Sequence, residues 1–362
     1  MYPARDARSA VWRAGRRRLV RRCLARWRVA LLVGPLLGPT TLLPSLLTAQ
    51  APVTAPAFGP LTAEEGSPLQ RIAYTATAEG ADVVAPGSVS AELWLGVSNI
   101  FEQDSASTHL LFLDFERLMT ALTVRVGVRE GLEVGGRLTL ETTGAGVLDG
   151  AIHWWHERMG FGQANRDRYP AGAYRQRLED GSGRALLDAR PRTLALDEIR
   201  MFAKWRAAAT ADGRNVLALR ATTRVPVTSD LFGSESADLA LAALGRLALG
   251  SWYVHGMLGA STVRGSAAEL DARLDDSAAF LMLGVERSLG SSVAAVVQWS
   301  IASAVLRGFH NREVDRAPSN LVLGLAGRAG DAWRWDVSFQ EDVPADTPAV
   351  DFTLGLRLSR TW

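Results

Sequence analysis

Hydrophobic and polar residues alternate with a period of two along most of the chain after residue 85. In the stretch 88–98, one phase holds Val, Ala and Leu, and the other holds Ser, Glu, Trp and Gly. Because successive side chains of a β-strand point to opposite faces, this pattern predicts strands with one apolar and one polar face.

The length of these strands favours a membrane over a soluble sandwich. Most span about ten residues or more, which matches the roughly 9–11 residues that a tilted strand needs to cross a bilayer. Trp252, Trp299 and Trp333 stand at the ends of apolar rows, where an aromatic girdle would lie. The sequence therefore predicts an all-β protein, an antiparallel transmembrane β-barrel.

The strand count predicted from the pattern is about twelve. The expected strands are 88–98, 109–128, 131–141, 193–207, 214–225, 238–249, 251–262, 277–288, 291–302, 319–328, 331–340 and 349–362. A further hairpin at 174–189 would raise the count to fourteen. The apolar phase changes between Phe115 and Leu118, so strand 109–128 needs a bulge or hides a break.

The C-terminal strand is an insertion-signal candidate. Its apolar phase ends on an aromatic residue and comprises Phe352, Leu354, Leu356, Leu358 and Trp362. It resembles the terminal strand by which bacterial outer-membrane barrels are recognised for insertion, so the barrel insertion machinery is an expected partner. Arg360 departs from the apolar phase. The alternative is the closing strand of a soluble β-protein.

Two segments do not follow the barrel repeat. Residues 51–87 are rich in Ala, Pro and Thr, and we expect a lead-in segment or a partial plug there. Residues 142–171 form the second, a helical or plug insertion. Within it, 147–159 reads as a short amphipathic helix ended by Gly160.

The polar face of this helix is a candidate ligand cluster, made of Asp149, His153, His156 and Glu157. One interpretation is a metal or proton-relay site. The other is a solvated helix face at the membrane surface or in the lumen. The two histidines are only three residues apart and no third strong ligand follows, so we expect no metal and no cofactor.

The first fifty residues resemble a secretory signal peptide. Seven arginines between residues 16 and 28 precede a mostly apolar stretch, and small residues follow. We expect cleavage between Ala49 and Ala51. The alternative is a transmembrane helix, which Pro35, Pro39 and Pro44 disfavour because each interior proline removes a helix hydrogen bond.

Charge is divided unevenly along the chain. The net charge is +2, but residues 1–50 hold ten arginines and one acid, Asp6, a net of +9. The remainder holds 30 basic and 37 acidic residues, a net of −7. The predicted mature protein is therefore acidic, which argues against a nucleic-acid partner. Its one cysteine, Cys23, lies in the predicted signal, so no disulfide is expected.

Charged residues in the polar phase are expected to face the lumen. They carry both signs, as the wall of a water-filled channel would, and comprise Arg125, Arg137, Arg220, Arg224, His255, Arg334 and Asp336. The segment from Arg158 to Arg206 is rich in arginine. It could line a pore, contact the phosphates of outer-membrane lipid and lipopolysaccharide, or form a solvated loop.

Short motifs follow one another in a fixed order along the chain: Phe58-Gly59-Pro60-Leu61, Ser67-Pro68, Ser98-Asn99-Ile100-Phe101, Asp114-x-Glu116, Leu148-Asp149-Gly150-x-Ile152-x-x-x-His156 and Tyr169-Pro170. Their series resembles a bacterial family regarded as outer-membrane barrels, the domain of unknown function 3187. The segment 160–163 departs from the Gly-Leu-Pro expected there. The resemblance implies the fold and an outer-membrane location, and no activity.

Three functions remain open at the level of sequence. We expect a non-enzymatic pore or small-solute channel with a partly plugged lumen. A lipid-acting enzyme is the second, but none of the five histidines is followed two residues later by the serine that such barrel hydrolases use. A structural or assembly barrel is the third.

Overall fold

The computed structural model describes residues 57–106, 109–159, 168–227, 237–263, 270, 272–343 and 349–362. These residues belong to one compact unit, 52–362. The predicted signal peptide lies outside the described residues and stays a prediction. No helix in the described ranges is both long enough and apolar enough to span a membrane.

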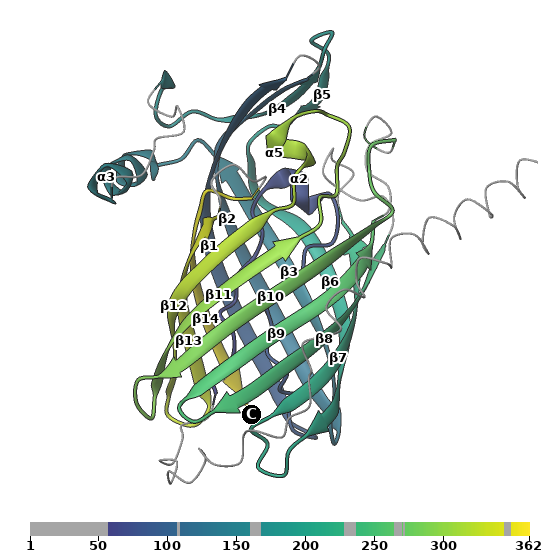
Figure 1. Ribbon diagram of the computed structural model, residues 1–362, viewed down its shortest axis with the longest axis vertical. Coiled ribbons are helices and arrows are strands. Elements are labelled where there is room, and N and C mark those ends of the chain that lie inside the picture. The colour runs from purple at the N-terminus through teal and green to yellow at the C-terminus, as the bar shows by residue number, and fades with distance from the viewer. Residues whose placement is uncertain are drawn as a thin grey trace, which may run out of the picture. The chain divides into compact units, whose positions relative to one another are not determined.

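Twelve antiparallel strands form a closed barrel (Figure 1). They are β1 (Val89–Ala106), β2 (His109–Arg129), β3 (Leu132–Gly144), β6 (Arg192–Ala209), β7 (Val216–Pro226), β8 (Asp238–Leu249), β9 (Trp252–Thr262), β10 (Ser277–Ser288), β11 (Val293–Ala302), β12 (Ser319–Ala329), β13 (Trp333–Asp342) and β14 (Phe352–Thr361). Pairing of β14 with β1, from Ser90↔Thr361 to Asn99↔Phe352, closes the ring and leaves it without an edge. The predicted β-barrel is confirmed.

The expected hairpin at 174–189 exists, but it does not enter the barrel wall. It consists of β4 (Arg175–Asp180) and β5 (Ala185–Asp188), and β4 pairs with residues 109–114 of β2. At that level β1 and β2 extend past the point where β14 ends. The hairpin therefore widens a two-stranded extension above the ring of twelve (Figure 1).

The bulge or break expected between Phe115 and Leu118 is absent. Residues 109–126 of β2 pair with β1 without a register shift, and the one irregularity in the strand lies at Gly127/Arg129. Odd-numbered side chains point inward throughout. Leu111, Leu113 and Phe115 are buried because loops pack against them above the ring, so an apolar inner side replaces a polar one without any change of phase.

The outer face of the barrel is apolar. Among its members, Leu93 is 42% exposed, Leu122 49% and Leu241 70%, values that a water-facing surface of a soluble protein would not repeat around a whole sheet. The expected girdle residues Trp252, Trp299 and Trp333 are partly exposed at strand ends, and Trp205 and Trp362, which the sequence analysis did not assign to a girdle, are exposed as well. Such an exterior suits contact with lipid.

One end of the barrel has short turns, and the other has long connections (Figure 1). The turns at the first end include Gly131 and Gly250, with φ of 72° and 65°, conformations that glycine adopts at little cost. The chain ends at this same end, where Trp362 exchanges backbone hydrogen bonds with Val89. We call the two ends the short-turn end and the long-loop end.

Candidate functional site

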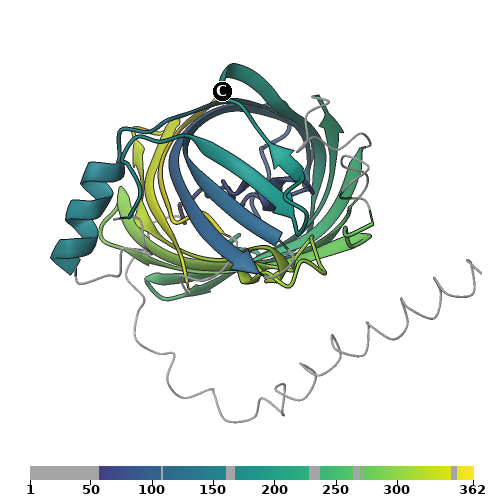
Figure 2. The same ribbon diagram turned by 90° about the horizontal axis from the view of Figure 1, so that it is seen from above.

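The lumen is occupied by residues 57–86, a segment that we call the plug. Seen from above, its chain crosses the interior of the ring (Figure 2). It rises from the short-turn end to the helical turn α2 (Pro68–Arg71) and returns to β1, as its contacts below establish. The plug thus corresponds to the predicted lead-in segment, while the helix α3 (Asp149–Met159) lies outside the ring in both views.

Wall side chains bind the backbone of the rising arm. The Glu286 carboxylate accepts hydrogen bonds from the N–H groups of Phe58 (2.9 Å) and Gly59 (3.1 Å), and His255 Nε2 lies 2.9 Å from the same carboxylate. The Gln298 amide accepts from Leu61 N–H at 3.0 Å and donates to Leu61 O at 3.1 Å. Polar wall residues therefore replace the β-sheet partners that this irregular backbone lacks.

The tip of the plug is held in the same way. Arg224 donates to the carbonyl oxygens of Arg71, Ile72 and Ala73 at 2.8–2.9 Å. Gly66 comes so close to the wall that an added Cβ would lie 3.3 Å from Ser98 Cβ, so no larger residue fits there without movement. Glu65 accepts from the Asn320 amide at 3.0 Å.

Carboxylates of the plug meet basic side chains of the wall. The rising arm brings Glu64, whose carboxylate lies 2.7 Å from Arg137 and 3.9 Å from Arg200. The descending arm brings Glu79, which pairs with Lys204 at 2.6 Å and with Arg220. Because all six side chains are at most about one-tenth exposed, these pairs lie out of bulk solvent.

The descending arm ends with two further contacts at the short-turn end. Asp82 pairs with Arg246, and the N–H of Val84 donates to Glu133 at 2.7 Å. Gly127 then accommodates the backbone of Ala85, since an added Cβ would collide with it. The plug is thus attached along its whole length.

Apolar contacts supplement the polar ones on the opposite wall. Tyr74 and Ala78 pack against Met257, Phe280 and Met282 of β9 and β10. Phe58 and Leu61 pack against small side chains of β11 and β12. The lumen is consequently uneven: the bases that meet the plug lie on β3 and β6–β8, whereas β9–β13 carry apolar and amide groups together with the His255–Glu286 pair and Asp336.

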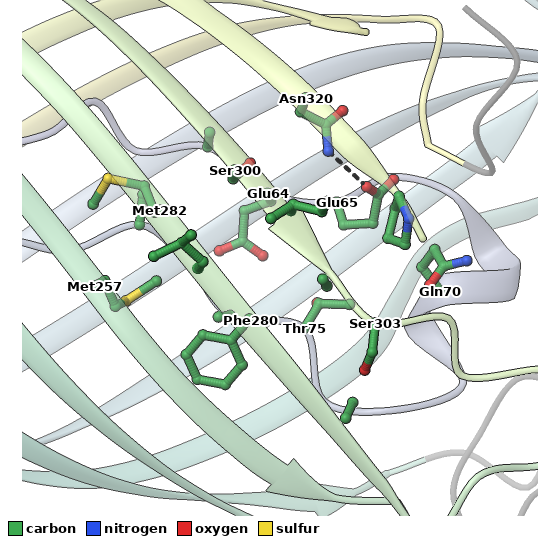
Figure 3. A pocket seen from close by; sticks show the side chains of 18 of the residues that line it. Glu64, Glu65, Gln70, Thr75, Met257, Phe280, Met282, Ser300, Ser303 and Asn320 are labelled. Carbon is green, nitrogen blue, oxygen red and sulfur yellow. Dashed lines mark hydrogen bonds between the residues drawn. The ribbon is translucent and has the colours of Figure 1, made fainter. Parts of the chain in front are cut away.

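A small cavity remains between the plug and the apolar wall (Figure 3). Its free volume is about 70 Å³, and its lining includes Glu64, Tyr74, Phe280, Ser300 and Asn320. The Glu65 side chain in Figure 3 reaches Asn320 across one side of it. Because an organic ligand generally needs about 300 Å³ or more, this space suits a few water molecules rather than a solute.

The predicted lumen-facing residues are placed as follows. Arg137, Arg224, His255 and Asp336 are buried, and the last pairs with Arg357. Arg125 is 15% exposed at its side chain and lies 3.1 Å from Glu92, and Arg220 pairs with Glu79 as above. Arg334, at the short-turn end, is exposed.

The predicted polar cluster on the helix is not gathered into one group by the described side chains. Asp149 accepts hydrogen bonds from Asn99 Nδ2 (3.1 Å) and from the N–H of Gly172 (2.7 Å), so it ties the helix to neighbouring segments. His153 and Glu157 form an exposed pair at 3.2 Å. The His156 side chain lies outside the described residues. Among the described residues, no three His, Cys, Asp or Glu side chains are grouped as metal ligands would be.

The arginine-rich stretch from Arg158 to Arg206 does not form one surface. In its described part, Arg177 and Arg184 are exposed on the β4–β5 hairpin, whereas Arg200 and Lys204 are buried in the lumen. These residues are close in sequence, but they lie on different surfaces, because the hairpin stands above the ring and the alternation of β6 turns Arg200 and Lys204 into the lumen.

The plug carboxylates Glu64, Glu79 and Asp82 were not among the candidate residues of the sequence analysis. Their segment has no strand or helix period, so nothing in its pattern shows which way a side chain points. A usable indication was charge: 57–86 holds four acids and one base, and the polar phase of the neighbouring strands holds several bases.

The C-terminal strand has two roles in the described structure. Its apolar phase, with Leu354 and Leu356 among the exposed side chains, belongs to the outer face. Its backbone closes the barrel against β1. Arg360, the departure from the apolar phase, lies over the rings of Trp333 and Trp362 at 5.3 and 5.1 Å from their centroids. Cation–π contact at the edge of the apolar belt explains its presence there.

Comparison with known proteins supports the fold. The profile of one family, described as "Protein of unknown function (DUF3187)", matches residues 41–362. The COG4313 outer membrane channel from Pseudomonas putida F1 aligns with 78% of this chain and 98% of its own, at 13% identity and a TM-score of 0.52. Such a level of identity shows a shared fold and nothing finer.

Two further solved barrels align more loosely. The NanC porin shares 7% identity over 75% of this chain and 98% of its own, with a TM-score of 0.43. The translocator domain of the autotransporter NalP from Neisseria meningitidis shares 11% over 77% and 90%, with a TM-score of 0.39. Neither supports an inference about this chain. No curated protein shows significant sequence similarity to it.

Proposed function

The chain belongs to the family described as "Protein of unknown function (DUF3187)", and from this premise and the plugged lumen we propose that it is an outer-membrane channel for small solutes, closed at rest by residues 57–86. The barrel carries an apolar exterior of lipid-facing type around an interior of charged and amide side chains. A barrel of this type without its plug would enclose a water-lined path.

The observation that carries the proposal is the way the plug is held. A permanent core would be expected to bury apolar side chains on all sides. Here one side of the plug is attached through ion pairs and hydrogen bonds, such as Glu64–Arg137 and Glu79–Lys204. Water can replace each of these contacts when the plug withdraws, so the open state leaves few groups unsatisfied.

An outer-membrane location is part of the proposal. The short-turn end, which holds Trp362, would face the periplasm, and the long connections would face outside, as in bacterial barrels generally. Lipid and lipopolysaccharide would then contact the apolar belt and the exposed arginines of the β4–β5 hairpin. The C-terminal strand would present Trp362 to the insertion machinery.

The lipid-acting alternative has little support from the described histidines. His255 is 1% exposed and lies in the lumen beside Glu286, whereas a lipid hydrolase needs its base at the outer face. The structural-barrel alternative differs from the channel in a single measurable respect, because it requires the plug to stay in place.

Conductance in planar bilayers tests the proposal. The variant lacking residues 57–84 should form long-lived open channels, while the intact chain should be closed for most of the recording. Retention of the barrel in the variant is checked by its heat-modifiable migration on gels. If the folded deletion variant conducts no more than the intact protein, the lumen is not a solute path and the channel proposal fails.

A further inference from the structure

Register in the sheet places basic residues of the wall directly beside one another. Arg137 of β3 pairs across the strands with Arg200 of β6, which in turn pairs with Arg224 of β7. Four residues along β6, Lys204 pairs with Arg220 in the same way. Like charges opposite one another repel, so such rows need counter-charges close by.

Wall carboxylates supply only part of that counter-charge. Glu198 lies 2.6 Å from Arg200, Asp238 lies 2.5 Å from Arg224, and Glu133 lies 3.0 Å from Lys204. Arg137 is less well matched, since its nearest wall carboxylate, Glu92, is 4.0 Å away.

The plug supplies the remainder. Glu64 lies 2.7 Å from Arg137, Glu79 pairs with Arg220, and Asp82 pairs with Arg246. Among the ion pairs of the described residues, Arg220 and Arg246 meet no other carboxylate within 4.0 Å. Three arginines on β3, β7 and β8 thus depend on three carboxylates of one displaceable segment.

These pairs resemble a ligand bound in its site more than the core of a fold. Each base is nine-tenths or more buried, and its nearest carboxylate belongs to the plug and not to the wall. The wall adds neutral acceptors only in part, the Thr123 hydroxyl to Arg137 and the carbonyl oxygens of Gly213 and Arg214 to Arg246. An oxyanion of a small solute could take the same position, because arginine binds carboxylate and phosphate oxygens in the same way.

We propose that Arg137, Arg220 and Arg246, assisted by Lys204, form a path for small oxyanionic solutes, and that Glu64, Glu79 and Asp82 of the plug occupy this path as internal substitutes for the solute. The inference rests on the proposed channel and adds its substrate class. It also gives a reason for an acidic plug: an incoming anion competes with the plug carboxylates for the same arginines and so favours the open state.

The apolar wall opposite narrows the class further. Met257, Phe280 and Met282 face the plug on that side and would face a solute once the plug has left. A solute with a carboxylate or phosphate at one end and carbon groups at the other would contact both walls. Its oxyanion would bind the arginines and its carbon skeleton would contact the apolar wall, so each part would contribute separately to its affinity.

Selectivity of the variant lacking residues 57–84 provides the test. In a potassium chloride gradient, its reversal potential should show preference for chloride. Replacing the three arginines with glutamine (Arg137→Gln, Arg220→Gln and Arg246→Gln) should bring the permeability ratio toward one. The control is Arg287→Gln, which removes one positive charge from the outer face, where Arg287 lies over Trp252. It should leave the ratio unchanged.

Block of the chloride current identifies the oxyanion. Succinate, inorganic phosphate and the neutral diamide succinamide are added in turn to the deletion variant. Concentration-dependent block by succinate or by phosphate, lost in the triple glutamine variant, supports the site. The anion that blocks at the lower concentration shows whether the site prefers a carboxylate or a phosphate. Equal effects of succinamide and succinate, or a conducting channel that prefers cations, would overturn the inference while leaving the channel proposal intact. A folded deletion variant that does not conduct refutes the channel itself.

Discussion

The ion pairs between plug and wall join residues that are distant in sequence: Glu64 meets Arg137, and Glu79 meets Lys204. On the wall, Arg137, Arg224, His255 and Asp336 are buried inside, where the polar phase predicted them. The directions of the Glu64 and Glu79 side chains could not be predicted, because irregular backbone has no period that fixes side-chain direction. Their partners lie far away in sequence and become neighbours only when the ring closes.

The Glu79 carboxylate should contribute strongly to keeping the plug in place. Replacing it with glutamine removes the charge that Lys204 and Arg220 share. A hydrogen bond to a charged group contributes about 1.5–3 kcal/mol, so the plug equilibrium should shift toward the open state by roughly 10- to 100-fold. The fraction of time open in single-channel recordings measures this shift.

The matched control is Glu130→Gln. It removes the same charge from an exposed turn, where Glu130 pairs with Arg206 and its side chain is 79% exposed. It should leave the open fraction unchanged. Equal open fractions for Glu79→Gln and wild type would mean that this ion pair does not restrain the plug.

The sequence predicted which segments are strands, but it predicted less well what each strand face contacts. Strand β2 has unbroken parity from His109 to Val126, yet its inner side changes from apolar to polar near Phe115. Sequence pattern reports apolar against polar positions, and it cannot distinguish a lipid-facing side from one that faces a packed loop. The expected bulge was wrong for this reason.

The helix α3 provides a prediction about an element outside the ring. Ile152 is 4% exposed, whereas Val147, just before the helix, is 88% exposed. Ile152→Asp should place a charge in an apolar contact and release the segment, at a cost of several kcal/mol. Limited proteolysis should then cut between residues 146 and 159 faster while the barrel persists.

Val147→Asp serves as the control and should leave the cleavage rate as in the wild type, because that side chain already faces solvent. Identical cleavage of the Ile152→Asp and Val147→Asp variants would show that the helix is not held by its buried face.

At the scale of the whole molecule, the architecture follows from the sequence, and the closed state does not. Strand length, the apolar outer phase and the even strand number all point to a membrane barrel. Residues 57–86 double back through the lumen. This path depends on contacts to nearly every strand, from Glu286 on β10 to Glu133 on β3. No local pattern encodes such an arrangement.

A reversible cross-link at the tip of the plug can hold it in the lumen. Gly66→Cys and Ser98→Cys would place two Cβ atoms about 3.3 Å apart, close to the spacing found in disulfides. Val350→Ala makes room, since the added Cβ would otherwise lie 2.8 Å from Val350 Cγ1. Glu79→Gln supplies a background in which the plug leaves often, and a variant with Gly66→Cys but not Ser98→Cys is the control.

The most direct measurement is the conductance of this cross-linked variant before and after dithiothreitol is added to the same bilayer. If withdrawal of the plug opens the barrel, the oxidised protein is silent, and openings appear on reduction, whereas the single-cysteine control opens under both conditions. Openings of equal size and frequency in the fully oxidised protein would contradict the account, because they would show that current passes with the plug fixed in place.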